Sequence, residues 1–267
     1  MRFKNHRRCA CILASLALIA LAYSVNARGE EAPLEIWPRQ TPAVDKKTLH
    51  SRNDAIDSAA SSLPLSLAPA VQFEKLFLRI MSGEAPSSWR GEIEKFASAA
   101  EQSPLETGLK NVARAWLARA EMADINIVLR NYYRHHVRFP FTFQEVEADI
   151  PENLRKDPWG DAWFYQPRAP WGFEGLTGQR YQLGPSRYPQ LGVLADATRD
   201  RAAAGPAWQI TPQDVAGNKA LEFHSTRAAA SVAVLQPGGR VDDCTLLFIG
   251  DRWALMAGID QLFAVSF

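Results

Sequence analysis

Apolar residues recur at helical spacing through the middle of the chain and predict one long amphipathic helix from Ser103 to His136. They lie three or four positions apart, as one face of an α-helix requires. The series is Leu105, Leu109, Val112, Trp116, Ala120, Ala123 and Ile127. Because the apolar face widens in the second half of the helix, we expect a β-sheet to pack there, beside Tyr132 and Tyr133.

Both ends of this helix carry recognisable signals. Ser103 and Glu106 supply the two side chains of a capping box, with a proline at the first helical position between them. Pro140 ends the run, because the residue before a proline avoids helical geometry. A second capping box, Thr142 with Glu145, predicts a short helix over about 143–149. Its entry would be fixed by a contact between Phe141 and Val146.

The segment Asp157-Pro158-Trp159-Gly160 predicts a tight turn. Asp157 can accept bonds from the turn backbone, Pro158 presets φ, and Gly160 tolerates a positive φ. The β-prone stretches 163–165 and 180–183 follow, and we expect them to pair antiparallel.

The last third of the chain predicts strands. Proline and glycine interrupt residues 185–218, where we expect a long, loop-rich excursion. Further strands are expected at 220–224, 231–236, 241–249, 253–257 and 262–267. Two helices are expected before Ser103, within an accessory region over 53–102. The predicted fold class is therefore α+β, a long helix packed on an antiparallel sheet, with extra N-terminal helices and C-terminal strands.

The first residues resemble a secretory signal peptide. Arg2, Lys4, Arg7 and Arg8 precede an uncharged run over 9–25, which ends at the small residues of Val25-Asn26-Ala27. We expect residues 1–27 to be a signal peptide and 28–52 a flexible linker. The exported chain would be periplasmic or extracellular. The alternative is an uncleaved anchor in the inner membrane, although the run is shorter than the roughly 20 residues that span a bilayer.

Charge content and cysteine count exclude some classes of partner and site. Charged residues make up 22% of the 267 residues and the net charge is +1, so nucleic acid is not an expected partner. A membrane contact is expected only through the N-terminal signal. Loss of the signal would leave Cys244 as the single cysteine, too few for an internal disulfide or a thiolate metal site. We expect a buried, inert thiol.

Several stretches, in order, resemble a known family. They are Leu129-Arg130-Asn131-Tyr132-Tyr133, then Arg138-Phe139-Pro140, then Asp157-Pro158-Trp159-Gly160, and finally Tyr181-Gln182-Leu183-Gly184. With a short helix and an aromatic strand between them, they resemble the periplasmic half of the type II secretion system protein G family, the major pseudopilins. The resemblance covers about a quarter of the chain. It implies a pseudopilin-like core over 103–184, followed by an excursion and strands over 185–267.

The chain departs from this family in two places. Gly29 is followed by Glu30-Glu31-Ala32-Pro33 instead of a prepilin-peptidase site and a membrane helix. The stretch equivalent to the lipid-buried half-helix carries Glu106, Lys110 and Arg114, and each charge costs about 2.5 to 3.5 kcal/mol at the bilayer centre. We therefore expect a water-facing helix that does not polymerise by the family's route.

Neither a metal nor another cofactor is expected. The family's calcium loop has no counterpart, because Asp196 and Asp200 are the only nearby carboxylates and calcium needs six to eight oxygens. His135 and His136 are adjacent on a helix and point apart, so a polar helix end is the simpler interpretation. The acidic group Glu145, Glu147, Asp149 and Glu152 is interpreted as the solvated face of a short helix.

The aromatic group Trp159, Trp163, Trp171 and Phe173 is the candidate binding surface. Packing against the long helix is the simpler role, but exposed rings would stack on a glycan or a peptide. The chain lacks G-x-S-x-G, S-x-x-K and a glycine-rich phosphate loop. We therefore expect a non-enzymatic structural or interaction protein whose partners are proteins, with secretion or pilus-like machinery as candidates. A ligand- or glycan-binding module is the alternative, and an uncharacterised hydrolase is a third hypothesis.

Overall fold

The computed structural model describes residues 32–41, 44–167, 181–198, 208–225 and 232–267. Within them the chain belongs to the mixed α+β class. The helices are α2 (Leu49–Ala60), α3 (Ala68–Met81), α4 (Pro86–Ser98), α5 (Pro104–His136), α6 (Gln144–Glu147) and α7 (Leu194–Ala197), with 3-10 turns at Leu65–Leu67 and Glu152–Leu154. No helix of the described part is both long and apolar enough to cross a membrane.

The predicted long helix is present and unbroken as α5. The Ser103 side chain accepts a hydrogen bond from the Glu106 N–H, as expected of its cap. The Glu106 carboxylate accepts from the N–H of Gln102 instead of that of Ser103, so the capping box closes one residue early. The helix ends at Val137, a β-branched residue in the left-handed region with φ 56°. Such a conformation is uncommon for this residue type.

A four-stranded antiparallel sheet forms the middle layer of the molecule. Its order is β6 (Arg240–Val241), β7 (Cys244–Ile249), β8 (Trp253–Ala257) and β9 (Leu262–Ser266). Side chains alternate across β8: Leu255 packs towards the helices, whereas Met256 packs towards a second sheet. Every residue of β8 is buried because both of its faces are covered.

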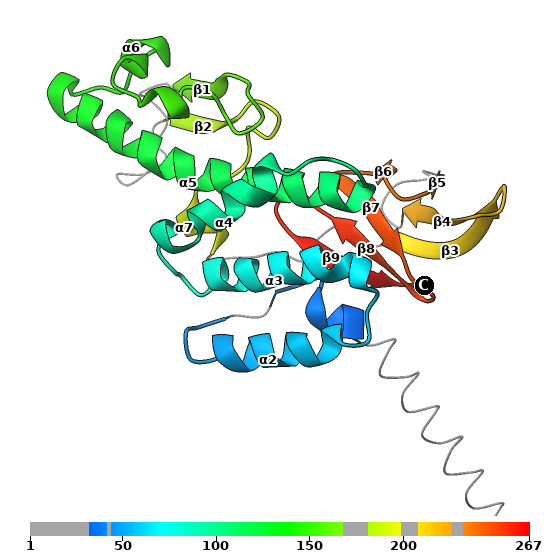
Figure 1. Ribbon diagram of the computed structural model, residues 1–267. Helices are drawn as coiled ribbons and strands as arrows, with labels where there is room; N and C mark the ends of the chain where they lie inside the picture. The colour runs from blue at the N-terminus through cyan, green and yellow to red at the C-terminus, as the bar shows by residue number, and fades with distance from the viewer. Residues whose placement is uncertain (1–31, 42–43, 168–180, 199–207, 226–231) are drawn as a thin grey trace, which may run out of the picture.

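Helices α3, α4 and the first half of α5 cover one face of this sheet (Figure 1). The closest approach is at Gly108 on α5, where a Cβ would lie 2.3 Å from Cδ2 of Leu247 on β7. Trp116 is fully buried in this layer, edge-on to Phe77 at 5.6 Å between ring centroids. The first half of α5 is therefore an interior element that is covered by protein.

A three-stranded sheet covers the other face, in the order β3 (Trp208–Val215), β4 (Asn218–Ser225) and β5 (Val232–Leu235). Its inner face presents Leu221 and Phe223 to the central sheet. The prediction of a loop-rich excursion over 185–218 was wrong in its second part, because β3 is a full strand paired with β4 along its length. β3 was not predicted from the sequence because it contains Pro212 and polar residues around it, which do not follow the usual pattern of a strand.

A two-stranded sheet flanks the second half of α5, as the widened apolar face predicted. It pairs β1 (Trp163–Pro167) with β2 (Tyr181–Pro185) in antiparallel register. The Tyr181 hydroxyl donates to Oδ1 of Asn126 on α5 at 2.6 Å. Tyr133 stacks on Phe139 at 4.8 Å, and Phe139 in turn meets Tyr181. Together with α6, these elements enclose a second hydrophobic core.

Three local expectations need correction. Trp37 is fully buried and stacks near Trp253, so the segment 28–52 is not a free linker throughout. Ile127 is exposed although it continues the apolar spacing, because the buried face of α5 turns towards Ile125 and Leu129. Phe141 is largely exposed while Val146 is buried, and α6 is one turn long, shorter than the expected 143–149. Cys244 is a buried free thiol, as predicted.

Candidate functional site

Asp157 organises the turn on which the family resemblance centres. Its Oδ1 accepts from the N–H groups of Trp159 and Asp161, both at 3.0 Å. Its Oδ2 accepts from the N–H of Ser186 at 3.1 Å, which ties the turn to the segment after β2. Gly160 closes the turn through its N–H to the Asp157 carbonyl at 2.8 Å and has φ +87°. Asp157 is buried, and both of its carboxylate oxygens accept backbone bonds, so its role is structural.

The Leu183-Gly184 pair in β2 has a glycine because the chain packs closely against this position. A Cβ on this residue would lie 2.6 Å from the carbonyl oxygen of Pro189 and 3.0 Å from its Cα. Gln182 on the same strand donates from its side-chain amide to that carbonyl at 2.9 Å. The chain after β2 therefore folds back directly onto the strand, and the close approach requires glycine.

The structure separates the members of the predicted aromatic surface. Trp163 is buried in the second core and donates its Nε1–H to the Leu154 carbonyl at 2.8 Å, so its ring faces are not available for stacking. Trp159 is half-buried, edge-on to Tyr188 at 5.5 Å, with its Nε1 3.4 Å from Oδ1 of Asn111. Trp171 and Phe173 lie outside the described residues. Of the described pair, only Trp159 keeps part of its ring open to solvent.

An exposed apolar surface lies at the C-terminal end of α5. Its two most exposed apolar residues are Val137 (78%) and Phe141 (68%). The Arg138 guanidinium lies 4.4 Å from the Phe141 ring centroid and 5.5 Å from that of Tyr132. We call the residues Tyr132, Val137, Arg138, Phe141 and Glu145 the α5 tip.

Glu145 holds the α5 tip together. Its Oε2 accepts from the Tyr132 hydroxyl at 2.6 Å and pairs with Arg138 Nη1 at 3.0 Å. Its Oε1 accepts from the N–H of Phe141 at 2.8 Å, and more weakly from that of Thr142. The Tyr132 hydroxyl, then the backbone donors and Arg138, lower the pKa of Glu145 to about 2. This carboxylate is exposed, as expected of a solvated face, and its bond from Thr142 is the predicted capping-box contact; it also fixes the loop that presents Phe141.

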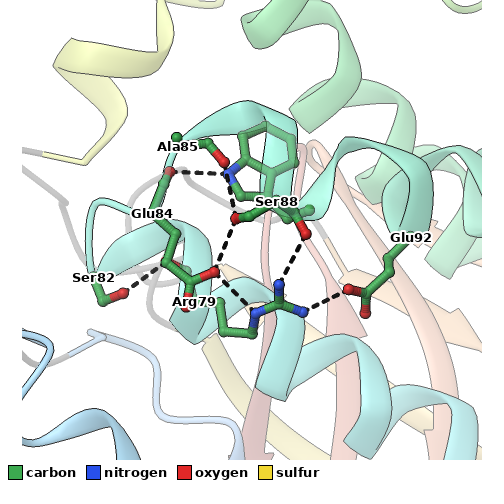
Figure 2. A network of polar contacts seen from close by, with 7 residues as sticks. Arg79, Ser82, Glu84, Ala85, Ser88 and Glu92 are labelled. Carbon is green, nitrogen blue, oxygen red and sulfur yellow. Dashed lines mark hydrogen bonds and ion pairs between the residues drawn. The ribbon is translucent and has the colours of Figure 1, made fainter.

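A polar network joins α3 to α4 (Figure 2). Arg79 binds Glu84 through Nε at 3.1 Å, Glu92 through Nη1 at 2.6 Å, and the Ser88 carbonyl through Nη2 at 2.9 Å. Ser88 Oγ returns a bond to Glu84 at 3.0 Å, which closes the loop between the two helices. The four-residue spacing of Glu84, Ser88 and Glu92 was visible in the sequence, but their shared partner was not. The network links the two helices through Arg79, and this role as a structural connection explains its contacts.

One carboxyl on α5 is buried without a full set of partners. Glu121 faces α4, and its Oε2 has no hydrogen-bond partner. Burial raises its pKa to about 8, against an opposing effect of the Arg90 guanidinium, which itself pairs with Asp124 at 2.7 Å. A neutral carboxyl in this position avoids placing an unpaired charge in a helix interface.

A cavity of about 350 Å³ lies where the edges of β3 and β9 approach each other. It is lined by Leu34, Pro38, Arg39, Trp208, Ile210, Ala264, Val265 and Ser266. The lining combines apolar side chains with the polar groups of Arg39 and Ser266, and within the described residues it contains neither a carboxylate nor a histidine. Neither of the two described residues of the predicted binding surface, Trp159 and Trp163, contributes to it.

Metal-ligating side chains do not converge in the described part of the chain, where no group of three His, Cys, Asp or Glu residues could hold an ion. His135 and His136 are exposed at the end of α5, and the His136 ring stacks on Tyr132 at 4.1 Å. Of the two calcium candidates, Asp200 lies outside the described residues, as does the side chain of Asp196.

Comparisons with protein-family models, with curated proteins and with solved structures find no match to this chain.

Gly184→Ala should destabilise the protein by about 1 to 3 kcal/mol, since the added methyl meets backbone atoms that cannot rotate away. Gly91→Ala is the matched control: it lies inside α4 with nothing within 4 Å of a Cβ, so alanine should be neutral or stabilising. Urea unfolding followed by circular dichroism compares the two variants. Equal stability of the two variants would contradict the close approach.

Glu121 should make stability fall as pH rises. Its carboxyl ionises near pH 4.5 when unfolded but at about 8 when folded, so folding takes up a proton in this window. The free energy of unfolding should decrease from about pH 5 to 9, by at most about 1.4 kcal/mol per pH unit from this group. Glu121→Gln should flatten that slope in urea unfolding, whereas Glu147→Gln, at an exposed site, should leave it intact. An unchanged slope in Glu121→Gln would refute the assignment.

Proposed function

We propose that the chain is an exported, non-enzymatic protein-interaction or assembly protein built on a pseudopilin-like core. The residues that carry the family resemblance support this proposal because each has a structural task in one unit. Asp157 ties its turn to Ser186, Gly184 admits the returning chain, and Tyr181 reaches α5. Four turn-friendly residues occurring by chance would not be expected to make such linked contacts.

The environment of the first half of α5 favours a role in water. Two of its charged residues have protein partners: Glu106 caps the helix start, and Lys110 pairs with Glu101 at 2.9 Å. Its apolar residues are covered by helices and by β7 and β8. This half of the helix is therefore not open to a lipid bilayer or to a helical filament core, and contacts with other proteins must use the outer surface.

The single observation that carries the proposal is the α5 tip. A loop fixed by four contacts to Glu145 presents a phenylalanine and a valine to solvent beside an arginine. Exposed apolar residues on a rigid support are typical of protein-docking surfaces, where aromatic and arginine side chains contribute most of the affinity. Rigidity favours binding, because little conformational entropy is lost on association. We assign protein partners to this surface, with pseudopilins or other secretion components as candidates.

The glycan- or ligand-binding alternative has less support. Trp163 uses its ring and its N–H inside the second core, and Trp159 is partly covered by Tyr188. A stacking platform needs open ring faces. Of the two described tryptophans, only Trp159 leaves part of a ring face open.

Binding of the purified chain to the periplasmic domains of its own organism's pseudopilins tests the proposal, by biolayer interferometry. Phe141→Ser should weaken binding at least about tenfold, equivalent to about 1.4 kcal/mol, because the main apolar contact is lost. Leu65→Ser is the control, since Leu65 is exposed at 92% on a different part of the molecule. Absence of binding, or equal loss in both variants, would contradict a docking role for the α5 tip.

A further inference from the structure

The described edge strands of the two stacked sheets differ in how they are protected from pairing. Soluble proteins shield an open strand edge with prolines, charges, short length or a covering segment. β3 contains Pro212 and Asp214, and β6 is two residues long with Arg240 in it. At the edge of β9, the Ala264 N–H donates to the Trp37 carbonyl at 2.7 Å.

β5 is the exception among these edges. It lies at the end of the order β3-β4-β5, and no described strand pairs with its second edge. Its sequence is Val-Ala-Val-Leu, with neither a charge nor a proline. Val232 and Val234 are 53% and 50% exposed on the outer face of the sheet. An uncharged edge strand with exposed β-branched side chains is well suited to accept another strand.

We propose that β5 is a self-association site, at which two copies of this chain join through antiparallel pairing of their β5 strands. A two-fold axis through Ala233 places Val232 of one copy opposite Val234 of the other. Cross-strand pairs of β-branched residues stabilise such a contact. Because β5 carries no charge, a two-fold axis brings no like charges face to face, and the same patch serves both copies. The result is one continuous six-stranded sheet. This inference does not depend on the proposed function.

The second copy is favoured over an unrelated strand by this self-complementarity. On β4, Glu222 lies beside Val234 and His224 beside Val232, one strand away from the axis. In the proposed dimer, Glu222 and His224 of each copy lie one strand farther from the axis than the valines. On the outer face, the strands that meet at the axis therefore contribute only valines to the contact. A four-residue strand pair buries less than the roughly 800 Å² per partner of a standard interface, so the dimer should be weak and dependent on concentration.

Sedimentation velocity of the full chain across a wide concentration range tests this proposal. The wild type should shift from one chain to two as concentration rises. The double variant Val232→Lys/Val234→Lys should dissociate roughly tenfold or more readily, because the edge then carries like charges on both copies. Val215→Lys is the matched control: it adds a lysine to an exposed valine of the same sheet, on β3, and should behave as wild type.

A charge-swap mixture separates loss of pairing from loss of folding. Val232→Glu/Val234→Glu should also remain monomeric alone, yet an equimolar mixture with the lysine variant should dimerise, since opposite charges then face each other. Dimerisation of the mixture would support pairing through β5. A wild type that stays monomeric, a lysine variant that associates as the wild type does, or a mixture that fails to associate would each overturn the proposal.

Discussion

An ion pair between buried Arg119, at the middle of α5, and half-buried Asp260 links the two hydrophobic cores of this protein. Arg119 Nη2 lies 2.5 Å from Asp260 Oδ2, in the turn between β8 and β9, and Nη1 donates to the Gly192 carbonyl after β2. The Trp116 indole donates to the Asp260 backbone carbonyl at 2.7 Å. Removing Asp260 would leave the buried Arg119 charge without this partner, and for fully buried pairs such a loss costs about 3 to 5 kcal/mol. The helix layer, the central sheet and the β1–β2 unit therefore meet at one point.

This junction makes α5 a spine shared by both cores. Upstream of Arg119, its large buried apolar residues face α3, β7 and β8; downstream, they face α6 and the two-stranded sheet. The close packing at Gly108 and the fixed loop around Glu145 lie near opposite ends of the same helix. A rigid helix held at its middle and near both ends can present the α5 tip in a defined orientation, which suits a protein that docks.

Local signals predicted much of this fold from the sequence. The cap at Ser103, the period of the apolar residues and the Asp-Pro-Trp-Gly turn are encoded within a few residues, and so are the strands at 253–257 and 262–267. Long-range packing could not be read in this way. Arg119 and Asp260 are 141 positions apart, β3 depends on its pairing with β4, and the burial of Trp163 and Glu121 depends on elements that fold over them. The aromatic residues Trp159, Trp163, Trp171 and Phe173 were grouped as one candidate surface because they are close in the sequence. Proximity in the sequence does not specify which rings turn inward.

Native-state hydrogen exchange along α5 tests most directly whether the helix is one spine shared by two cores. The account predicts that buried amides on both sides of Arg119, such as those of Val112 and Ile125, exchange only through global unfolding and report a single free energy. Two distinct free energies that change near Arg119 would show that the two halves unfold separately and would contradict the account.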